Sequence, residues 1–332
     1  MGCQVIVVTQ LPRYKVAMTV TMPTPDAPLK IGTRGSPLAL AQAYETRRRL
    51  VTAFDLPQEA FEIVVIKTTG DNRAMIDADR PLKEIGNKGL FTKEIEEAML
   101  SGAIDIAVHS SKDMPVEQPE GLILDCFLPR EDVRDAFVSL KYKGIAELPQ
   151  GAIVGTSSLR RKAQLLAKRP DLQVVEFRGN VQTRLKKLGD GVAEATFLAV
   201  AGLNRLGMDD VPFTPVDTAD MLPAIAQGAI GIERRIDDER AKTLLAAIHH
   251  SETGHRITCE RAFLGALDGS CETPIGGLSH IEGDMIALQG ELLSLDGTRI
   301  LTIGGTAPVA DGAELGQRLG TELLAKAGPD FL

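Results

Sequence analysis

The chain has 332 residues, more than one hydrophobic core usually supports, and this length predicts two or three domains of ~100 residues each. Its 37 basic and 45 acidic residues give a net charge of −8, which repels polyanions such as DNA and anionic membrane surfaces. Aromatic residues make up only 4% and tryptophan is absent, so stacking platforms for single-stranded nucleic acid are scarce. Composition therefore disfavours nucleic-acid and membrane-surface binding.

The N-terminal segment and the cysteines indicate the compartment. Residues 1–28 lack a basic start, an uninterrupted apolar core and a small-residue cleavage site, so we expect a loosely ordered extension rather than a signal peptide. Met18 or Met22 is a candidate for the true start, and no apolar run reaches the ~18 residues that span a bilayer. Neither a metal site nor a disulfide framework is indicated by the spacing of Cys3, Cys126, Cys259 and Cys271. We predict a cytoplasmic protein without a metal.

From Leu29 onward, strand-like runs alternate with amphipathic helical stretches, which is typical of α/β domains with mostly parallel sheets. We predict a strand over Leu29–Gly32, followed by a helix with Ser36 as its N-cap, Pro37 as its first residue and an end near Leu50. The other elements predicted here are strands over 61–68 and 104–108 and a helix with Phe91, Ile95, Ala98 and Met99 on one face.

The same alternation restarts after Gly151 and predicts a second, similar α/β lobe, with residues 129–150 between the two. Its predicted elements are strands over 152–155, 172–177 and 196–200 and helices over 158–168 and 181–188. Beyond Ile236 the pattern changes to that of a smaller α+β domain. There we predict helices over 238–249 and 259–267, a hairpin over 286–303 turning at Asp296-Gly297, and a final helix with Leu315, Leu319 and Leu323 on one face.

Charged and hydroxylic residues follow four of the predicted strands, where ligands of open α/β sheets bind. These strand exits are residues 33–36, 109–113, 156–161 and 177–184. Between Gly151 and Asp190, nine basic residues face only three acidic ones, and arginines at a helix N-terminus call for a compensating anion. Because no phosphate-binding glycine motif is present, we predict a small ligand with several carboxylates, bound by guanidinium groups. Solvated helix faces are the interpretation we prefer for Lys168, Arg169, Lys186 and Lys187.

Three single residues are candidates for chemistry, each with a plainer alternative. Asp113 beside Lys112 is either a surface ion pair or a cleft carboxylate that stabilises a developing cation. His109 closes a buried strand, which favours a hydrogen-bonded core residue over a general base. Cys271 lies in the Gly- and Pro-rich stretch 268–277, which predicts an exposed loop thiol, reactive or plain. Cys126 and Cys259 fit inert core positions.

Taken together, these segments closely resemble the hydroxymethylbilane synthase (porphobilinogen deaminase) family from Leu29 to the C-terminus. The motifs that carry the resemblance are Gly32-Thr33-Arg34-Gly35-Ser36-Pro37, Lys67-Thr68-Thr69-Gly70-Asp71, Lys88-Gly89-Leu90-Phe91, Val108-His109-Ser110-Ser111-Lys112-Asp113, Gly155-Thr156-Ser157-Ser158-Leu159-Arg160-Arg161, Arg178-Gly179-Asn180-Val181-Gln182-Thr183-Arg184, Leu198-Ala199-Val200-Ala201-Gly202-Leu203, and Cys271 with Pro274-Ile275-Gly276. One departure is Ala226, where the family's Leu-Pro-Ala-Val-Gly-Gln-Gly segment has glycine. Another is Glu194, where an aspartate is usual.

The resemblance implies a fold of three domains: two doubly wound lobes like those of periplasmic binding proteins and a smaller α+β C-terminal domain. The division it implies is an extension over 1–28, domain 1 over 29–129 and 228–246, domain 2 over 130–227 and domain 3 over 247–332. It also implies a monomer that condenses four porphobilinogen molecules, with loss of ammonia, and releases hydroxymethylbilane by hydrolysis. The primer is a dipyrromethane cofactor joined to Cys271 by a thioether.

Site residues follow from the same resemblance. Asp113 is implied as the catalytic residue that faces the pyrrole nitrogens, and Cys271 as the attachment point. Each pyrrole carries an acetate and a propionate, and the residues implied to bind these carboxylates are Arg34, Ser36, Lys88, Lys112, Thr156, Ser158, Arg160, Arg161, Arg178, Arg184 and Arg205. Two other functions stay open: a non-catalytic anion receptor of the periplasmic type, and a nucleic-acid binder using the basic segment 160–187.

Overall fold

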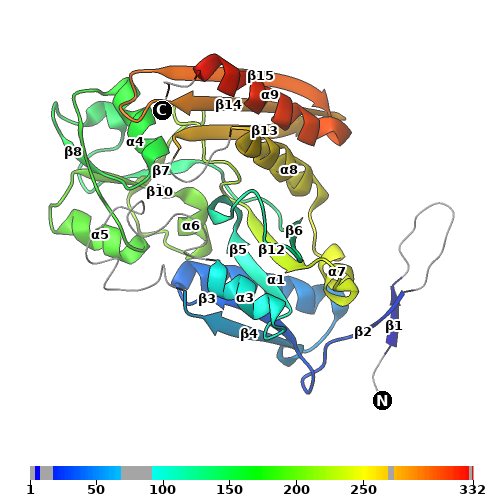
Figure 1. The fold of residues 1–332 in the computed structure, drawn as a ribbon. Coiled ribbons are helices and arrows are strands. Elements are labelled where there is room, and N and C mark those ends of the chain that lie inside the picture. The colour runs from blue at the N-terminus through cyan, green and yellow to red at the C-terminus, as the bar shows by residue number, and fades with distance from the viewer. Residues whose placement is uncertain (1–3, 8–17, 69–91, 268–272, 329–330, 332) are drawn as a thin grey trace.

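The structure is a computed structural model that describes residues 4–7, 18–68, 92–267, 273–328 and 331. Of the four sheets in the described residues, the three larger ones organise the chain, and each of these is covered by its own helices (Figure 1). We call the first two units, each built on a five-stranded sheet, the first lobe and the second lobe, and the three-stranded sheet with its helices the C-terminal unit. The described residues include no helix that is both long and apolar enough to cross a bilayer.

The first lobe has the strand order β4-β3-β5-β12-β6. Its strands are β3 (Leu29–Arg34), β4 (Phe61–Ile66), β5 (Ile106–Ser110), β6 (Leu122–Phe127) and β12 (Ile230–Arg235). β3 runs parallel to β4 and β5, whereas β12 is antiparallel to β5 and β6, so the sheet is mixed rather than mostly parallel. β12 returns to this sheet from far along the chain and lies between two strands of the N-terminal half.

Helices cover both faces of that sheet. They are α1 (Pro37–Phe54), α3 (Lys93–Leu100) and α7 (Glu239–Ala246), and short 3-10 turns occur at Gln58–Ala60 and Ser111–Asp113 (η4). Apolar residues of α1 and α7 form a core on one face, and Ile95 and Met99 of α3 form a smaller core on the other. The predicted cap of α1 is confirmed, because Ser36 Oγ accepts a hydrogen bond from Ala39 N at 3.3 Å and Pro37 is the first helical residue.

The N-terminal segment differs from the prediction. A short strand β1 (Gln4–Val7) pairs antiparallel with β2 (Met18–Thr21), and the main-chain oxygen of Thr21 accepts a bond from Arg240 Nε on α7 at 2.9 Å. Val20 and Met22 are buried in the core of the first lobe. The prediction of a loosely ordered extension is therefore wrong for these residues, because apolar side chains there are buried against the lobe.

The second lobe has the strand order β11-β7-β10-β8-β9. Its elements are β7 (Asp135–Val138), η5 (Ile145–Glu147), β8 (Ile153–Gly155), α4 (Leu159–Lys168), β9 (Gln173–Val175), α5 (Val181–Gly189), β10 (Ala195–Ala199), α6 (Val200–Arg205) and β11 (Phe213–Pro215). β8 is parallel to β9 and β10, while β7 is antiparallel to β10 and β11. The chain passes between the lobes twice, through residues 128–134 and 216–229, which we call the two crossovers.

The C-terminal unit packs two helices on one antiparallel sheet. Its elements are α8 (Ser251–Ala266), β13 (Ile275–Glu282), β14 (Met285–Leu293), β15 (Ile300–Pro308), η6 (Val309–Asp311) and α9 (Gly312–Ala327). The predicted hairpin is confirmed as β14–β15. Two predictions are wrong: α8 begins well before Cys259, with His250 as its N-cap, and β13 already includes Ile275–Gly277, which we had placed in a loop. The glycines of β13 fit a strand here because Gly277 packs under Ile225 and Phe263.

Candidate active site

Asp135 lies at the centre of the candidate site. It opens β7, is 0% exposed, and sits opposite the N-terminus of α4. Thr156 Oγ1 accepts from Ser158 N at 3.2 Å, and Ser158 Oγ in turn accepts from Arg161 N at 3.4 Å. These two hydroxyl groups therefore shape the start of α4, and the helix directs its first arginines toward Asp135.

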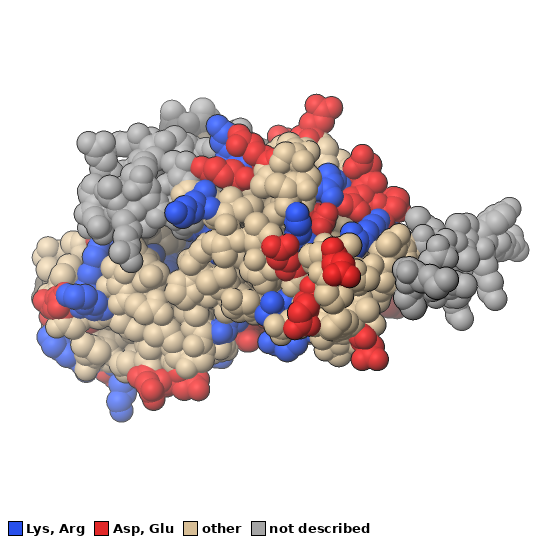
Figure 2. Space-filling model, turned by 90° about the horizontal axis from the view of Figure 1, so that it is seen from below, with Lys and Arg blue, Asp and Glu red and all other residues tan. Residues whose placement is uncertain are grey.

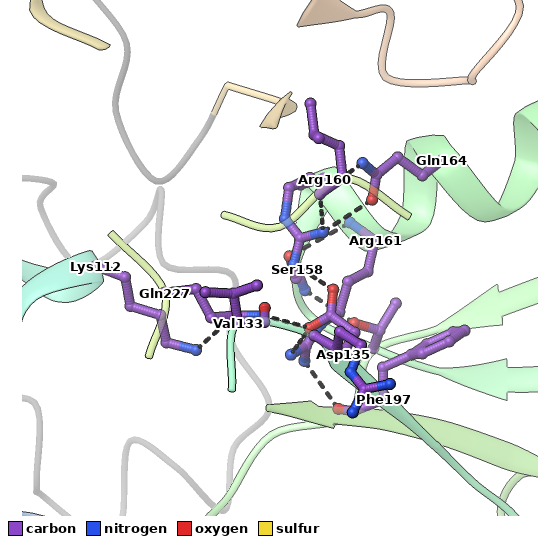
Figure 3. Close-up of polar contacts among 12 residues, drawn as sticks. Lys112, Val133, Asp135, Ser158, Arg160, Arg161, Gln164, Phe197 and Gln227 are labelled. Atoms are coloured by element: carbon purple, nitrogen blue, oxygen red, sulfur yellow. Dashed lines mark hydrogen bonds and ion pairs between the residues drawn. The ribbon is translucent and has the colours of Figure 1, made fainter. Parts of the chain in front are cut away.

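Arg160 and Arg161 both bind this one carboxylate (Figure 3). Arg160 Nη2 lies 2.7 Å from Asp135 Oδ2, and Arg161 Nη2 lies 2.6 Å from Oδ1. Their other donors reach main-chain oxygens of Leu222 (2.7 Å) and Phe197 (2.8 Å). Burial alone raises the pKa of the Asp135 carboxyl, but the two guanidinium groups outweigh burial and hold that pKa well below its usual range. Part of the anion that these arginines require is thus supplied by the protein.

Two further cations lie near this pair, and Asp113, Glu176 and Glu291 are other acids that act on the four. Burial lowers the pKa of Lys112 to about 8, and Arg161 and Arg160 act in the same direction. Burial also lowers the pKa of Arg184 to about 10, again with a contribution from Arg161. Lys112, Arg160, Arg161 and Arg184 form what we call the cation cluster, and Asp135 is the buried carboxylate within it. Positive charge gathered on two buried and two half-buried side chains favours an anionic ligand.

Asp113 and Lys112 occupy the turn η4, which follows β5. Asp113 is exposed, whereas Lys112 is half-buried and its Nζ lies 3.3 Å from Gln227 Oε1. The turn is held from below: Ser111 N donates to Ala229 O at 3.0 Å, and Arg261 of α8 donates to Pro115 O and Val116 O. These bonds fix the main chain of the turn from which both side chains project.

The remaining predicted binding residues lie at several places. Arg34 ends β3 and is half-buried, and Arg178 is half-buried without a hydrogen bond or ion pair to the described residues. The donors of Arg205 face Gly228 O (2.8 Å) and Glu45 (3.7 Å), so the structure places it with α1 and a crossover rather than in the cation cluster. Lys88 and Cys271 lie outside the described residues.

The described chain resumes after the Cys271 segment close to the arginines. Pro274 O accepts from Leu293 N at 3.0 Å, and Gly277 N donates to Pro223 O at 2.9 Å. Pro223 is the neighbour of Leu222, whose oxygen accepts from Arg160. The start of β13 is thereby fixed beside the crossover that contacts the cation cluster.

Burial is confirmed for three residues that were predicted to lie in the core. His109 is buried on β5 with its Nε2 3.3 Å from the Glu233 carboxylate of β12, but this contact lacks hydrogen-bond geometry, so the predicted hydrogen bond is not found among the described residues. Cys126 and Cys259 are buried free thiols, and burial raises the pKa of Cys259 to about 12. A thiol with such a pKa is protonated and unreactive near neutral pH.

A second buried carboxylate, Glu260 of α8, joins the crossovers to the C-terminal unit. Arg130 binds it with two bonds, of 2.6 and 3.0 Å, and Ala226 N and Ser279 N donate to it at 2.8 and 2.9 Å. Arg130 belongs to one crossover and Ala226 to the other. Glu260 therefore fixes both crossovers to α8 and β13.

Sequence reasoning missed three residues that bind the cation cluster: Asp135, Gln164 and Gln227. Gln164 Oε1 accepts from Arg160 Nη1 at 2.9 Å, and Gln227 Oε1 lies 3.3 Å from Lys112 Nζ. Asp135 stands at the end of the charged run 130–135, so it looked like a solvated residue, although the apolar strand that follows it was a signal. Gln227 lies in the apolar run 221–232, and a polar residue in such a run signals a buried hydrogen-bonding role.

Charge on the surface is mixed. On the face turned toward the viewer in Figure 2, lysines and arginines alternate with aspartates and glutamates, and the described residues form no continuous basic surface there. No group of three or more His, Cys, Asp or Glu side chains among the described residues is arranged to hold a metal ion.

Comparisons with known proteins agree on one family. Residues 29–243 match the family model described as porphobilinogen deaminase, dipyromethane cofactor binding domain, and residues 255–325 match porphobilinogen deaminase, C-terminal domain. The porphobilinogen deaminase of Paracoccus denitrificans is 63% identical over 310 residues, which cover 93% of this chain and 98% of that protein.

Solved structures with a related arrangement include periplasmic binding proteins. One is an arginine-specific binding protein of Salmonella typhimurium, 14% identical, with a TM-score of 0.38 over 66% of this chain and 91% of that one. Another is the aliphatic sulphonate-binding protein of Escherichia coli, 15% identical, with a TM-score of 0.39 over 72% of this chain and 70% of that one.

Proposed function

The chain belongs to the porphobilinogen deaminase family, and we propose that it holds its dipyrromethane cofactor through Cys271. It is a transferase of tetrapyrrole biosynthesis that condenses porphobilinogen head to tail with loss of ammonia, and hydrolysis releases hydroxymethylbilane. This membership replaces the receptor and nucleic-acid functions that the sequence alone left open.

The observation that carries the assignment of the site is the cation cluster around Asp135. A cofactor and product chain built from pyrroles with acetate and propionate groups is strongly anionic, and the half-buried Lys112 and Arg184 together with the buried Arg161 suit it. Arg160 Nε is buried and has no acceptor among the described residues, which supports a further acceptor from a ligand or water. The residues present therefore fit the cofactor.

We assign the side chains as follows. When bound, the cofactor supplies the free pyrrole α-carbon to which the first substrate unit is joined. Asp113, exposed on a turn with a fixed base, accepts hydrogen bonds from pyrrole N–H groups and stabilises positive charge that develops on the rings. The carboxylate-binding residues that we propose are Arg34, Ser36, Lys88, Lys112, Thr156, Ser158, Arg160, Arg161, Arg178 and Arg184. Arg205, occupied by Gly228 and Glu45, stays a prediction from the resemblance.

We also propose the division of the chain and its setting. Domain 1 comprises 29–129 and 228–246, domain 2 130–227 and domain 3 247–332. The separate sheets of the two lobes and of the C-terminal unit support this division. We propose a cytoplasmic monomer that acts on a small-molecule substrate without a membrane partner.

Mass spectrometry tests the attachment. The intact holoenzyme should carry the mass of one dipyrromethane, and peptide mapping should place it on the Cys271 peptide. Cys271→Ser should lose both the added mass and the activity, whereas Cys259→Ser, at a buried unreactive thiol, should keep the adduct. An active protein whose Cys271 peptide is unmodified would refute the proposal.

A further inference from the structure

Gln227 connects the two lobes inside the candidate site. Its side chain is 0% exposed and lies in the second crossover, between Lys112 of the first lobe and Asp135 of the second (Figure 3). The amide oxygen lies 3.3 Å from Lys112 Nζ, and the amide nitrogen donates to Asp135 Oδ1 at 3.0 Å and to Val133 O at 2.8 Å. Its main-chain oxygen accepts from Arg130 Nε at 2.9 Å. Both ends of one amide are therefore used, each for a group of opposite charge.

Only a neutral amide meets both requirements. An ammonium group needs an acceptor, and a carboxylate needs a donor, and glutamine is the side chain of this length that offers both. A glutamate would place a second carboxylate against Asp135, and a leucine would leave Lys112 without this acceptor. The hydrogen bond to Val133 O fixes which end of the amide faces which partner.

The charge of Lys112 depends on this acceptor because its other neighbours act on its pKa in opposite directions. Asp113 on its own turn and Asp135 on β7 favour its charged form, whereas burial and Arg160 and Arg161 of α4 disfavour it. The pKa of Lys112 is lowered to about 8 as a result, so its charge changes just above neutral pH. A small change in its hydrogen bonding then alters the charged fraction at working pH.

We propose that Gln227 is a positioning residue for the reaction: its amide oxygen holds the Lys112 ammonium beside Asp113, and its amide nitrogen ties that ammonium to the Asp135 cluster across the lobes. The inference rests on the proposed role of Lys112 in binding carboxylates. The new element is that the Gln227 amide sets the distance between Lys112 of the first lobe and the arginines of the second lobe, which bind the same ligand. The affinity for porphobilinogen then decreases as Lys112 loses its proton above pH 8.

Two substitutions at Gln227 separate this role from a structural one, because they act on Lys112 in opposite directions. Gln227→Leu removes the acceptor and should lower the pKa of Lys112 by about 1, since a hydrogen bond to a charged group is worth about 1.5 kcal/mol or more. Gln227→Glu adds a negative charge and should raise that pKa by a similar amount. A general loosening of the crossover would move the pKa in the same direction in both variants.

The pKa can be read directly on the holoenzyme. Lysines are reductively methylated with 13C-formaldehyde, the Lys112 signal is identified by its loss in Lys112→Arg, and its chemical shift is titrated by NMR. The KM for porphobilinogen is measured over the same pH range. Gln118→Leu removes an amide that, among the described residues, bonds to Pro115 O; it is the matched control and should leave the titration of Lys112 unchanged.

We expect the pKa of Lys112 to fall in Gln227→Leu and to rise in Gln227→Glu. The pH at which KM begins to rise should move in the same direction as the pKa in each variant. Changes in one direction, or none in either variant, would overturn the inference. Opposite changes in pKa with an unaltered KM profile would also overturn it, because Gln227 would then not serve the reaction. Failure of the proposed function has a different signature, an active protein with an unmodified Cys271 peptide.

Discussion

Two buried carboxylates lie where the chain passes between its lobes. One belongs to a structural ion pair and the other to the candidate binding site. Glu260 and Asp135 are both 0% exposed, and arginine lowers the pKa of each below its usual range although burial opposes this. Glu260 has one arginine and otherwise neutral donors from Ala226 and Ser279, so its charge is balanced. Asp135 has two arginines, and Lys112 and Arg184 lie near them. Of the other acids that act on these cations, Asp113 and Glu176 are exposed and burial raises the pKa of Glu291, so positive charge remains in the buried part of the cluster.

The difference teaches how to distinguish an anchor from a binding site when both look like buried ion pairs. A balanced pair with all its acceptors used is complete without a ligand and holds elements together. An unbalanced cluster keeps positive charge that water alone solvates poorly, and a ligand with several carboxylates completes it. Burial and pKa direction are the same in both places, so the charge count decides.

The largest expected effect is on the Glu260–Arg130 ion pair, the anchor that holds both crossovers to the C-terminal unit. Glu260→Gln removes the charge that compensates buried Arg130, and breaking a buried pair in this way costs about 3–5 kcal/mol of the free energy of unfolding. Denaturant unfolding should show this loss at neutral pH. Because the pKa of Glu260 is lowered in the folded protein, the unfolded chain takes up the proton first, so the advantage of the wild type should begin to shrink as the pH falls below the ordinary glutamate pKa of ~4.3 and continue to shrink toward the lowered pKa. KM, measured well below the melting temperature, should change little.

Asp132→Asn is the matched control for that experiment. It breaks an Arg134–Asp132 pair in the same crossover, but the side chains there are 44% and 20% exposed, so the loss should stay below about 1 kcal/mol. If Glu260→Gln proved as stable as Asp132→Asn, or raised KM while still folded, Glu260 would not be a mere anchor.

The next prediction concerns a residue whose replacement should change kcat but not the stability of the fold. Asp113→Asn should lower kcat by about 10²–10³-fold, because the neutral amide no longer stabilises positive charge on the rings. Asp113 is exposed, so the midpoint of unfolding should be unchanged, and the cofactor mass should still be found on the chain. Glu117→Gln, at an exposed acid nearby, should leave kcat as in the wild type. Wild-type turnover by Asp113→Asn would remove its catalytic role.

A smaller effect tests the excess of charge itself. Arg184→Met should raise KM about 10-fold or more, as expected for the loss of a charge-assisted hydrogen bond. It should not lower the melting temperature, because burial already disfavours this guanidinium and lowers its pKa to about 10. Lys186→Met, on the same helix but exposed and paired with Asp190, should alter neither quantity. If Arg184→Met had a normal KM and a lower melting temperature, Arg184 would stabilise the fold rather than bind the ligand.

The sequence predicted the outline of this arrangement because strands, caps and strand exits are local features. The Ser36 cap, the arginines of α4 and the turn with Asp113 all stand where periodicity and turn residues placed them. The partner of the arginines was not predictable in the same way. Asp135 precedes Arg160 by 25 positions and resembles its charged neighbours, so only the register of β7 beside β10 shows that it is buried.

Long-range pairing also explains the other omissions. β12 enters the first sheet between β5 and β6 only because the chain returns from the second lobe, and no local pattern shows which strands it joins. Gln227 and Glu260 act through contacts with residues about a hundred positions away. Polar residues inside apolar runs were the available signal, and they indicate burial but not the partner.

The smallest effect concerns Ala226, the residue at which this chain departs from the glycine of its family. Ala226 has a φ of 60°, a left-handed conformation that costs a residue with a Cβ about 1–2 kcal/mol. Ala226→Gly relieves this strain but loses a buried methyl group and gains freedom in the unfolded chain, so its net effect should stay within about 1 kcal/mol. Ala229→Gly, equally buried but without a positive φ, suffers both losses and gains no relief. Denaturant unfolding should therefore find Ala226→Gly about 1–2 kcal/mol more stable than Ala229→Gly. Equal stabilities would mean that the left-handed conformation of Ala226 costs no measurable strain. The hydrogen bond from Ala226 N to Glu260 would then fix the crossover without a backbone cost.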